Sequence, residues 1–358
     1  MGEGLHIGAQ LSVSLDAQVC DLAIGESRPG VAMTTDSMMI WFSMSKAVCA
    51  VAIGQLWEQG RLDVEAPASR YVPEFGANGK TDITLRHLLT HTAGIPWACG
   101  LLEGRPWRES VAENRARIYA APIVDGWTLG ERAGYHPTSA HTVLGAVVEA
   151  VDGRSYDRYV RAEVLEPLGM IDSWVGMPSE QFDAYGDRIG EMQNTASGAN
   201  GILGIDTRAV APLAIPGANG RGPMRELRRL YEMLVAGGTR DGVRLLDPVT
   251  VAALSARHRV GLVDETFGVE LHWGLGLAVD TSIMGRHSSR RAFGHGGAQS
   301  SAAFCDPETG LAMAVVCNGM PGGERHSPRM DAIATAVYED LGLARGPGRD
   351  KPYPSTGI

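Results

Sequence analysis

The segment Trp41–Gly60, WFSMSKAVCAVAIGQLWEQG, carries the strongest structural signal of the chain. It joins a short apolar run to a helical pattern. Apolar residues recur at helical spacing after the serine-rich turn, and Gly60 is a typical helix stop. We therefore predict a helix with Ser43 at or just inside its start. Residues three apart share a helix face, so the Ser43 hydroxyl and the Lys46 amine are predicted to lie together.

Lys46 belongs to a rare residue type, since only three of the 32 basic residues in the chain are lysines. A guanidinium stays protonated at any working pH, whereas a partly buried ammonium can lose its proton and act as a base. A serine hydroxyl becomes a good nucleophile only when a base accepts its proton. The free N–H groups and partial positive charge at a helix start also favour a developing oxyanion. The Ser-x-x-Lys pattern therefore indicates nucleophilic catalysis.

The composition narrows the class of protein. A net charge of −9 and an isoelectric point near 5.6 argue against nucleic acid or an anionic membrane as the main partner, because both require a basic surface. No run of 18 apolar residues occurs, and the first residues lack a signal-peptide pattern, so we expect a cytoplasmic protein. The scattered, odd-numbered cysteines favour reduced thiols. They are Cys20, Cys49, Cys99, Cys305 and Cys317.

Both ends of the chain have strand patterns. Residues 9–16, AQLSVSLD, alternate between apolar and polar side chains, and residues 19–25, VCDLAIG, are a predicted hairpin partner. Residues 300–319, SSAAFCDPETGLAMAVVCNG, contain two further apolar runs separated by a turn at 306–310. The two ends are therefore predicted to form antiparallel sheet.

The region between the ends is mostly helical in pattern. One helix is predicted after Pro137 and stops at Gly153. Further predicted helices are Leu85–His91, Arg108–Ala120, Pro223–Ala236 and Pro248–His258. We expect an α/β (α+β) fold in one unit, residues 1–345, with an antiparallel sheet flanked by helices and a mostly helical insertion. The expected parts are a sheet domain of about 1–60 plus 260–345, a helical domain of about 61–259, and a flexible tail, 346–358.

Two further stretches have the residue types of an active site. GYHPTSAHTVLG places Tyr135 in a loop directly before a helix start, where the local field favours a phenolate. FGHGGAQSSAAF is polar and glycine-rich before it enters an apolar strand. Gly296 and Gly297 there allow another backbone or a ligand to approach closely.

In this order and spacing, the Ser-x-x-Lys, Tyr and His-Gly-Gly motifs resemble the three active-site elements of the serine β-lactamase and penicillin-binding-protein superfamily. The resemblance is nearest to class C β-lactamases and the related family VIII esterases and acyltransferases, where His-Gly-Gly often replaces Lys-Thr-Gly. The stretches LRHLLTHTAGIP, YEMLVAGG and FCDPETGLAMAVVCNG are also similar to that family, and the similarity runs from about Leu5 to Leu343.

The resemblance implies a serine hydrolase of the esterase type that forms an acyl-enzyme on ester or amide substrates without a cofactor. Its partners would be a small acyl substrate and, for transfer, an acyl acceptor. The implied site residues are Ser43 as nucleophile, Lys46 and Tyr135 as the coupled base, the Ser43 and Ala298 N–H groups as oxyanion hole, and His136, His295, Gly296 and Gly297 at the substrate. Either Lys46 or Tyr135 can be the base proper.

The chain departs from the β-lactamase pattern at the second motif, where Tyr-x-Asn becomes Tyr135-His136-Pro137. Proline offers no side-chain donor or acceptor for a β-lactam amide, so antibiotic hydrolysis ranks low. An acyltransferase of secondary metabolism is the main alternative to an esterase, and a non-catalytic binding module is a weaker one.

Other site interpretations are weaker. His87 and His91 have the i, i+4 spacing of zinc ligands, but the glutamate of His-Glu-x-x-His and a third ligand are missing, so no metal is expected. Ser45 competes with Ser43 as nucleophile, but it would face away from Lys46. His141 is a further candidate for substrate contact, with a capping or surface role as the alternative.

Overall fold

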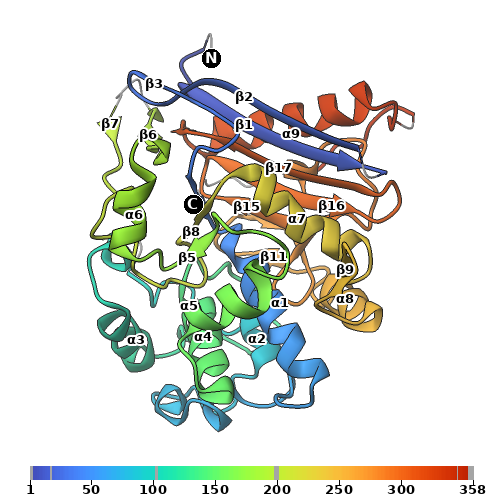
Figure 1. Cartoon of the computed structure of the whole chain (residues 1–358). Coiled ribbons are helices and arrows are strands. Elements are labelled where there is room, and N and C mark those ends of the chain that lie inside the picture. Colours follow the sequence, from blue (N-terminus) through green and yellow to red (C-terminus); the bar gives the residue numbers. More distant parts are fainter. Residues whose placement is uncertain (1–2, 17, 101–103, 197–200, 345, 354–358) are drawn as a thin grey trace.

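The computed structural model describes the chain except for residues 1–2, 17, 101–103, 197–200, 345 and 354–358. An eight-stranded antiparallel sheet occupies one side of the molecule (Figure 1). In spatial order its strands are β13 (His272–Trp273), β14 (Ala278–Val279), β15 (Phe293–Gly297), β16 (Ser301–Asp306), β17 (Leu311–Cys317), β1 (Gly8–Leu15), β2 (Gln18–Arg28) and β3 (Val31–Ala32).

The two ends of the chain meet in the middle of this sheet. Strand β1 pairs with β17 from the far end of the chain, with Leu11 opposite Val315, and with its hairpin partner β2, with Leu11 opposite Leu22. Strands β16 and β17 flank the turn predicted at 306–310. The predicted antiparallel sheet from the chain ends and the predicted fold class are confirmed.

Helix α7 (Met224–Val235) covers one face of the sheet, and it buries the polar side of β1. Ser12 Oγ accepts a hydrogen bond of 2.7 Å from Arg228 Nε, and Gln10 Oε1 accepts one of 3.1 Å from the Met224 N–H. Both polar side chains are buried, while Leu11 on the apolar side is only partly covered. The alternation of β1 therefore predicted the strand, but its polar side is the more deeply buried one.

Helix α9 (Gly323–Asp340) lies on the other face of the sheet (Figure 1). Met330, Ala334 and Tyr338 pack there on the sheet. No helix was predicted over residues 323–340, and Pro328 lies inside this helix. Pro328 has no N–H to donate to the Glu324 carbonyl, so the helix lacks one hydrogen bond there, and its packing on the sheet holds it in place.

The remaining helices form the other half of the molecule, together with several short strands. These helices are α1 (Ser45–Glu58), α2 (Leu85–Leu89), α3 (Val111–Ala120), α4 (Ser139–Asp152), α5 (Tyr156–Val160), continued by the π-helical turn Arg161–Leu165, α6 (Ser179–Tyr185) and α8 (Pro248–Ser255). The short strands are β4 (Met39–Phe42), β5 (Trp174–Val175), β6 (Gln193–Asn194), β7 (Gly201–Ile202), β8 (Gly220–Gly222), β9 (Thr239–Arg240), β10 (Val243–Arg244), β11 (Val263–Asp264), β12 (Val269–Glu270) and β18 (Gly319–Met320). The helices predicted from the sequence are all present, with ends that differ by up to three residues.

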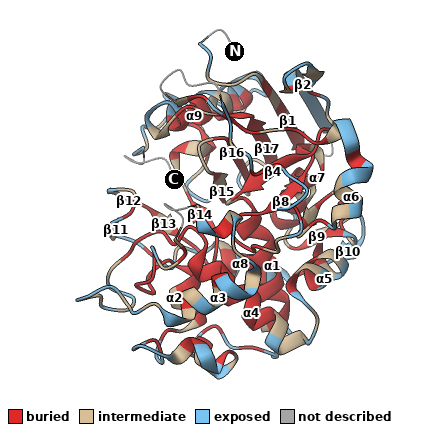
Figure 2. Ribbon diagram, turned by 90° about the vertical axis from the view of Figure 1, so that its left-hand side faces the viewer, coloured by how far each residue is buried: buried red, intermediate tan, exposed pale blue. Residues whose placement is uncertain are grey.

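Helix α1 is the central helix of the fold. It packs against α4, α5 and α8 and touches strand β15, and its residues from Ser45 to Leu56 are all buried (Figure 2). A helix that is apolar on every side is stable only inside a protein. The first turn of α1 is thereby held at the junction between the sheet and the helical half.

The predicted division of the chain into a sheet domain, a helical domain and a flexible tail differs from the structure at helix α7 and at the tail. Helix α7 falls inside the predicted helical part, 61–259, but packs on the sheet. The predicted flexible tail is anchored as far as Tyr353: Arg349 pairs with Asp280 at 2.9 Å, and the Tyr353 hydroxyl donates to Asp331 at 2.7 Å. Residues 354–358 of the predicted tail lie outside the described residues. No helix within the described ranges is long and apolar enough to cross a membrane.

Candidate active site

Ser43 lies in a tight turn between strand β4 and helix α1. Phe42 has a φ of +49°, a conformation that a bulky residue adopts only when its surroundings enforce it. Ser45 holds this turn, because its hydroxyl donates to the Phe42 carbonyl at 2.6 Å and accepts from the Gly220 N–H at 2.8 Å. Ser45 thus faces away from Lys46, as expected, and its hydrogen bonds are structural. The turn presents Ser43 at the start of the buried helix.

Lys46 is fully buried one turn further along, and its amine has three hydrogen-bond partners. Nζ lies 3.0 Å from Ser43 Oγ, 2.7 Å from the Pro137 carbonyl oxygen and 2.8 Å from the Gly217 carbonyl oxygen. A Cβ on Gly217 would lie 3.3 Å from Nζ and 3.1 Å from the Cβ of His141, so a larger residue there would press on both side chains. The amine therefore has a single, enforced position beside the serine hydroxyl.

Burial lowers the pKa of Lys46 to about 7. Taking a charged ammonium out of water favours its neutral form, and no acidic side chain pairs with this one among the described residues. The two carbonyl partners match the two N–H groups of a neutral amine, whose lone pair is then left for the Ser43 hydroxyl. Near neutral pH the group can accept a proton, which an arginine could not do.

Tyr135 approaches Ser43 from the loop before α4. Its hydroxyl donates to Ser43 Oγ at 2.7 Å, and its backbone N–H donates to Asp264 Oδ1 at 3.0 Å. Asp264 forms a fully buried ion pair with Arg259 at 3.0 Å. The ring of Tyr135 packs between Phe267 and other aromatic side chains of the site. A carboxylate 129 residues further along the chain therefore fixes the position of the tyrosine.

The protonation state expected for Tyr135 differs from the one that the structure favours. Burial raises the pKa of the phenol well above its ordinary value, and this effect outweighs the hydrogen bond with Ser43, which lowers the pKa. The helix start was expected to favour a phenolate, but the loss of water around the ring is the stronger effect. Tyr135 is therefore a neutral phenol, which can give a proton rather than take one.

Strand β15 brings the His-Gly-Gly motif to the same site. A Cβ on Gly297 would lie 2.4 Å from the Trp41 carbonyl oxygen, so only glycine lets β15 pass this close to the segment that leads to Ser43. His295 Nδ1 contacts the Gly296 carbonyl at 2.6 Å, and its Nε2 has no partner among the described residues. Burial and the nearby Lys46 lower the pKa of His295 to about 3, so this histidine is neutral.

Two hollows meet at Ser43, and Ala298 is the other residue that lines both. The first, here called the aromatic hollow, has a volume of about 100 Å³, and Tyr135 lines it together with His295. Its apolar walls include Phe267, Leu271, Trp273, Ala278 and Ile283. The second, here called the open hollow, has a volume of about 440 Å³. Its lining includes Phe42, Trp107, Arg108, Thr138, Leu203, Ile205 and Met320. Ser43 can therefore be reached from two chemically different sides.

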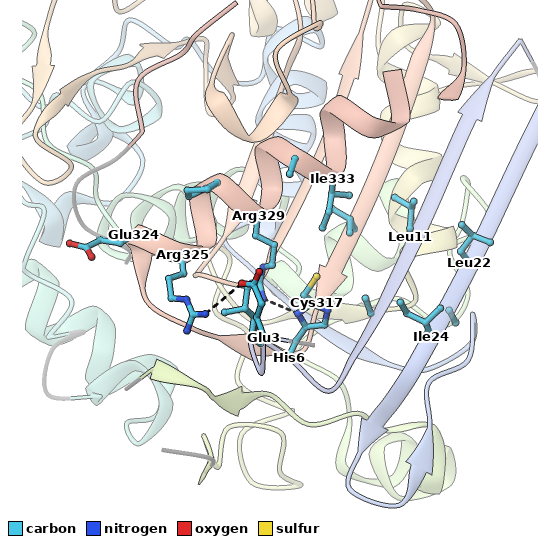
Figure 3. Close-up of a pocket in the computed structure, with 16 residues that line it drawn as sticks. Glu3, His6, Leu11, Leu22, Ile24, Cys317, Glu324, Arg325, Arg329 and Ile333 are labelled. Atoms are coloured by element: carbon cyan, nitrogen blue, oxygen red, sulfur yellow. Dashed lines mark hydrogen bonds and ion pairs between the residues drawn. The ribbon is translucent and has the colours of Figure 1, made fainter. Parts of the chain in front are cut away.

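Another groove lies away from these residues (Figure 3). It runs between α9 and strands β1 and β2, where Leu11, Leu22 and Ile24 form an apolar wall, and it has a volume of about 930 Å³. Charged side chains gather at one end, where Arg325 pairs with Glu3 at 3.6 Å. None of the predicted catalytic residues lines this groove, so size alone does not indicate the site of chemistry.

The structure does not bring His136 to the substrate side. This side chain is fully buried: its Nε2 accepts from the Ile95 N–H at 3.0 Å, and its Nδ1 contacts the Gly134 carbonyl at 2.6 Å. The role predicted for His136 at the substrate is therefore corrected to one in holding the loop that carries Tyr135. The ring lines neither hollow, because both of its nitrogens are turned toward backbone groups.

Of the other histidine candidates, His91 and His141 are buried and His87 is half-buried. Helix α2 ends at Leu89, so His91 is not on the same helix as His87, and the assumed zinc-ligand spacing does not apply. His87 caps α2, and His91 packs its ring 4.7 Å from that of Tyr135. His141 is fully buried near Lys46 and lines neither hollow, so it neither contacts substrate nor has the alternative surface role.

The arrangement supplies a serine hydroxyl, a deprotonatable amine, a neutral phenol and two hollows, which are the parts of an acyl-transfer site. Sequence patterns missed Asp264, Arg259 and Gly217, which position the reactive groups. Asp264 and Gly217 contact Tyr135 and Lys46 across 129 and 171 residues of the chain, and Arg259 acts through Asp264, so no local signal identifies these three residues.

Comparisons with known proteins agree with this chemistry. A family model described as Beta-lactamase matches residues 1–338. The protein "Esterase/beta-lactamase LipL" of Mycobacterium tuberculosis is 32% identical over 343 residues, which cover 87% of this chain and 77% of that protein. A solved penicillin-binding-protein homologue from Caulobacter crescentus is 28% identical with a TM-score of 0.76, covering 94% of this chain and 93% of its own. A family VIII carboxylesterase is 26% identical with a TM-score of 0.75, covering 93% of each chain.

The family match spans nearly the whole chain, and the relatives combine the fold with names that describe esterases and penicillin-binding-protein homologues. The resemblance expected from the three motifs is confirmed. The chain thus belongs to the beta-lactamase family and is an enzyme of its ester-hydrolysing and acyl-transferring group.

Proposed function

We propose that the protein is an esterase that works through an acyl-enzyme on Ser43. The observation that supports this most directly is the convergence of Lys46 Nζ at 3.0 Å and Tyr135 Oη at 2.7 Å on Ser43 Oγ. Both groups come from separate parts of the chain and are buried. Acid and base groups within hydrogen-bond reach of a nucleophile typically contribute about 10²–10⁴ in rate.

Lys46 is the base in this proposal, since a group with a pKa near 7 can take a proton at neutral pH and a phenol with a raised pKa cannot. The Ser43 oxygen attacks the ester carbonyl carbon while its proton passes to the Lys46 amine. When the tetrahedral intermediate collapses, the bond to the leaving oxygen breaks and Tyr135 gives that oxygen its proton. The Lys46 ammonium then returns a proton to Tyr135, and water repeats the sequence to release the acid.

The oxyanion is held, in this proposal, by the backbone N–H groups of Ser43 and Ala298. Both residues line the junction of the two hollows, which is where the carbonyl carbon must sit. One such donor typically contributes about 3 kcal/mol of transition-state stabilisation. Gly297 supports the arrangement by letting strand β15 approach the Trp41 backbone.

The two hollows receive different halves of the ester. Tyr135 lines the aromatic hollow and not the open one, so the oxygen that it protonates leaves through the aromatic hollow. The acyl group then occupies the open hollow, and His295 faces the alcohol. The apolar walls of the aromatic hollow can also seat an alcohol in place of water, so an acyltransferase remains the alternative function. Hydrolysis of β-lactams ranks below both, because Pro137 replaces the asparagine of the second motif.

The location of the protein stays a prediction. The described cysteines are free thiols, four of them buried and Cys20 exposed, which agrees with the expected cytoplasmic location.

The test is trapping of the acyl-enzyme with p-nitrophenyl butyrate, followed by mass spectrometry of the peptide that contains Ser43. The expected result is a butyryl group on that peptide, which is lost together with turnover in Ser43→Ala and retained in Ser45→Ala. Turnover in Ser43→Ala at the wild-type rate would exclude the proposed nucleophile. Adding an alcohol acceptor and measuring ester against acid then separates transfer from hydrolysis.

A further inference from the structure

The open hollow has one charged side chain in its lining, that of the exposed Arg108. Its backbone N–H donates to the Arg105 carbonyl at 2.9 Å, but within the described part of the chain no carboxylate pairs with its guanidinium and no group hydrogen-bonds to that guanidinium. Its neighbours differ: Arg105 and Arg117 both pair with Glu109, at 3.2 Å and 2.6 Å. Arg108 thus differs from the two nearby arginines, which have a carboxylate partner. Its guanidinium is available to an anionic group of a ligand in the open hollow.

The position of the guanidinium suits a ligand in the hollow. The Arg108 side chain folds back over Gly104, where a Cβ would lie 3.9 Å from its Cζ and Nε atoms. Trp107 beside it packs edge-on against Phe42, with ring centroids 6.3 Å apart, and Phe42 directly precedes Ser43. Arg108 therefore belongs to the same wall of the open hollow as Trp107 and Phe42, next to Ser43.

The rest of the lining separates the nucleophile from the cation with apolar surface. Phe42, Leu203, Ile205 and Met320 supply this surface, which can pack against methylene groups.

We propose that the acyl group of the substrate carries a carboxylate at its far end and that Arg108 binds it. The enzyme would thus act on monoesters of dicarboxylic acids, with the methylene chain along the apolar wall of the open hollow. This inference rests on the proposed function, in particular on the acyl group occupying the open hollow. A guanidinium is suited to the task because its two parallel N–H groups match the two oxygens of a carboxylate.

The experiment compares two substrates that differ only in charge, mono-p-nitrophenyl adipate and its methyl-capped form. The ratio of their kcat/KM values is measured for the wild type, for Arg108→Gln, and for Arg105→Gln as a matched exposed arginine outside the hollow. Charge-assisted hydrogen bonds predict a preference of roughly ten- to hundredfold for the free acid in the wild type. We expect that preference to vanish in Arg108→Gln and to persist in Arg105→Gln.

A wild-type enzyme that hydrolyses both esters equally well, or prefers the capped one, would overturn the inference without any variant. An acid preference that survives in Arg108→Gln would assign the selection to another residue and would overturn it as well. Turnover of the capped ester by Ser43→Ala reports separately on the proposed function. If that turnover is lost while the acid preference is absent from the wild type, the esterase proposal stands and only the inference about Arg108 fails.

Discussion

Replacing Lys46 by methionine tests the chemical step on which the proposed mechanism depends. Methionine is unbranched and of similar length, so it can occupy the buried channel, but it cannot accept a proton. The change removes three contacts of the amine, those to Ser43 Oγ and to the Pro137 and Gly217 carbonyl oxygens. Lys46→Arg removes the same base while keeping the positive charge, because a guanidinium stays protonated.

The expected loss follows from the role of the amine as a general base. Such a group contributes about 10²–10⁴ in rate, so kcat/KM should fall by that factor in both variants, which corresponds to about 3–5 kcal/mol of transition-state stabilisation. The wild type should also show a specific pH profile. With a pKa of about 7, Lys46 is mostly protonated at acid pH and mostly neutral at alkaline pH. Its kcat/KM should therefore rise roughly tenfold from about pH 6 to about pH 8.

The assay is the initial rate of p-nitrophenyl butyrate hydrolysis, corrected for alkaline hydrolysis and for the folded fraction of each variant. Lys80→Met is the matched control, because Lys80 is also fully buried and also donates to backbone carbonyls, those of Tyr119 and Ala121. That variant should lose stability but keep its kcat/KM and its pH profile. A pH-independent wild type, or Lys46→Met acylating within a few-fold of wild type, would refute the assignment of the base.

Two further predictions concern the neighbours of the nucleophile. Tyr135→Phe removes the proposed proton donor. Its kcat/KM should fall much more for an ethyl ester than for a p-nitrophenyl ester, because p-nitrophenolate departs without protonation. Equal losses for the two esters would contradict the role of the phenol. Ser45→Ala removes two buried hydrogen bonds, those to the Phe42 carbonyl and from the Gly220 N–H, so the free energy of unfolding in urea should fall by about 2 kcal/mol. Ser43→Ala, which breaks no backbone contact, should unfold close to the wild-type midpoint, and the same loss in both variants would contradict the structural role of Ser45.

The fold owes much of its predictability to local patterns. Alternating polarity predicted β1, and helical spacing that ends at a glycine predicted α1 and α4, although β1 buries its polar side and both helices are buried over most of their length. Helix α9 escaped prediction because Pro328 lies within it. The contacts of the tail were not predicted, because its composition is typical of a flexible chain end. The carboxylate partners of Arg349 and Tyr353 are distant in the sequence and lie beside them only in the folded state.

Ser43, Lys46 and Tyr135 could be predicted as the reactive groups from the amino-acid sequence, because they lie in motifs whose spacing and residue types are recognised locally. The tertiary structure alone decided their protonation states and surroundings. Burial sets the Lys46 amine near neutrality and keeps Tyr135 a phenol, and it turns His136 from a substrate contact into a loop support. Desolvation depends on every atom packed around a group, and those atoms come from segments far apart in the chain, so no local pattern encodes it.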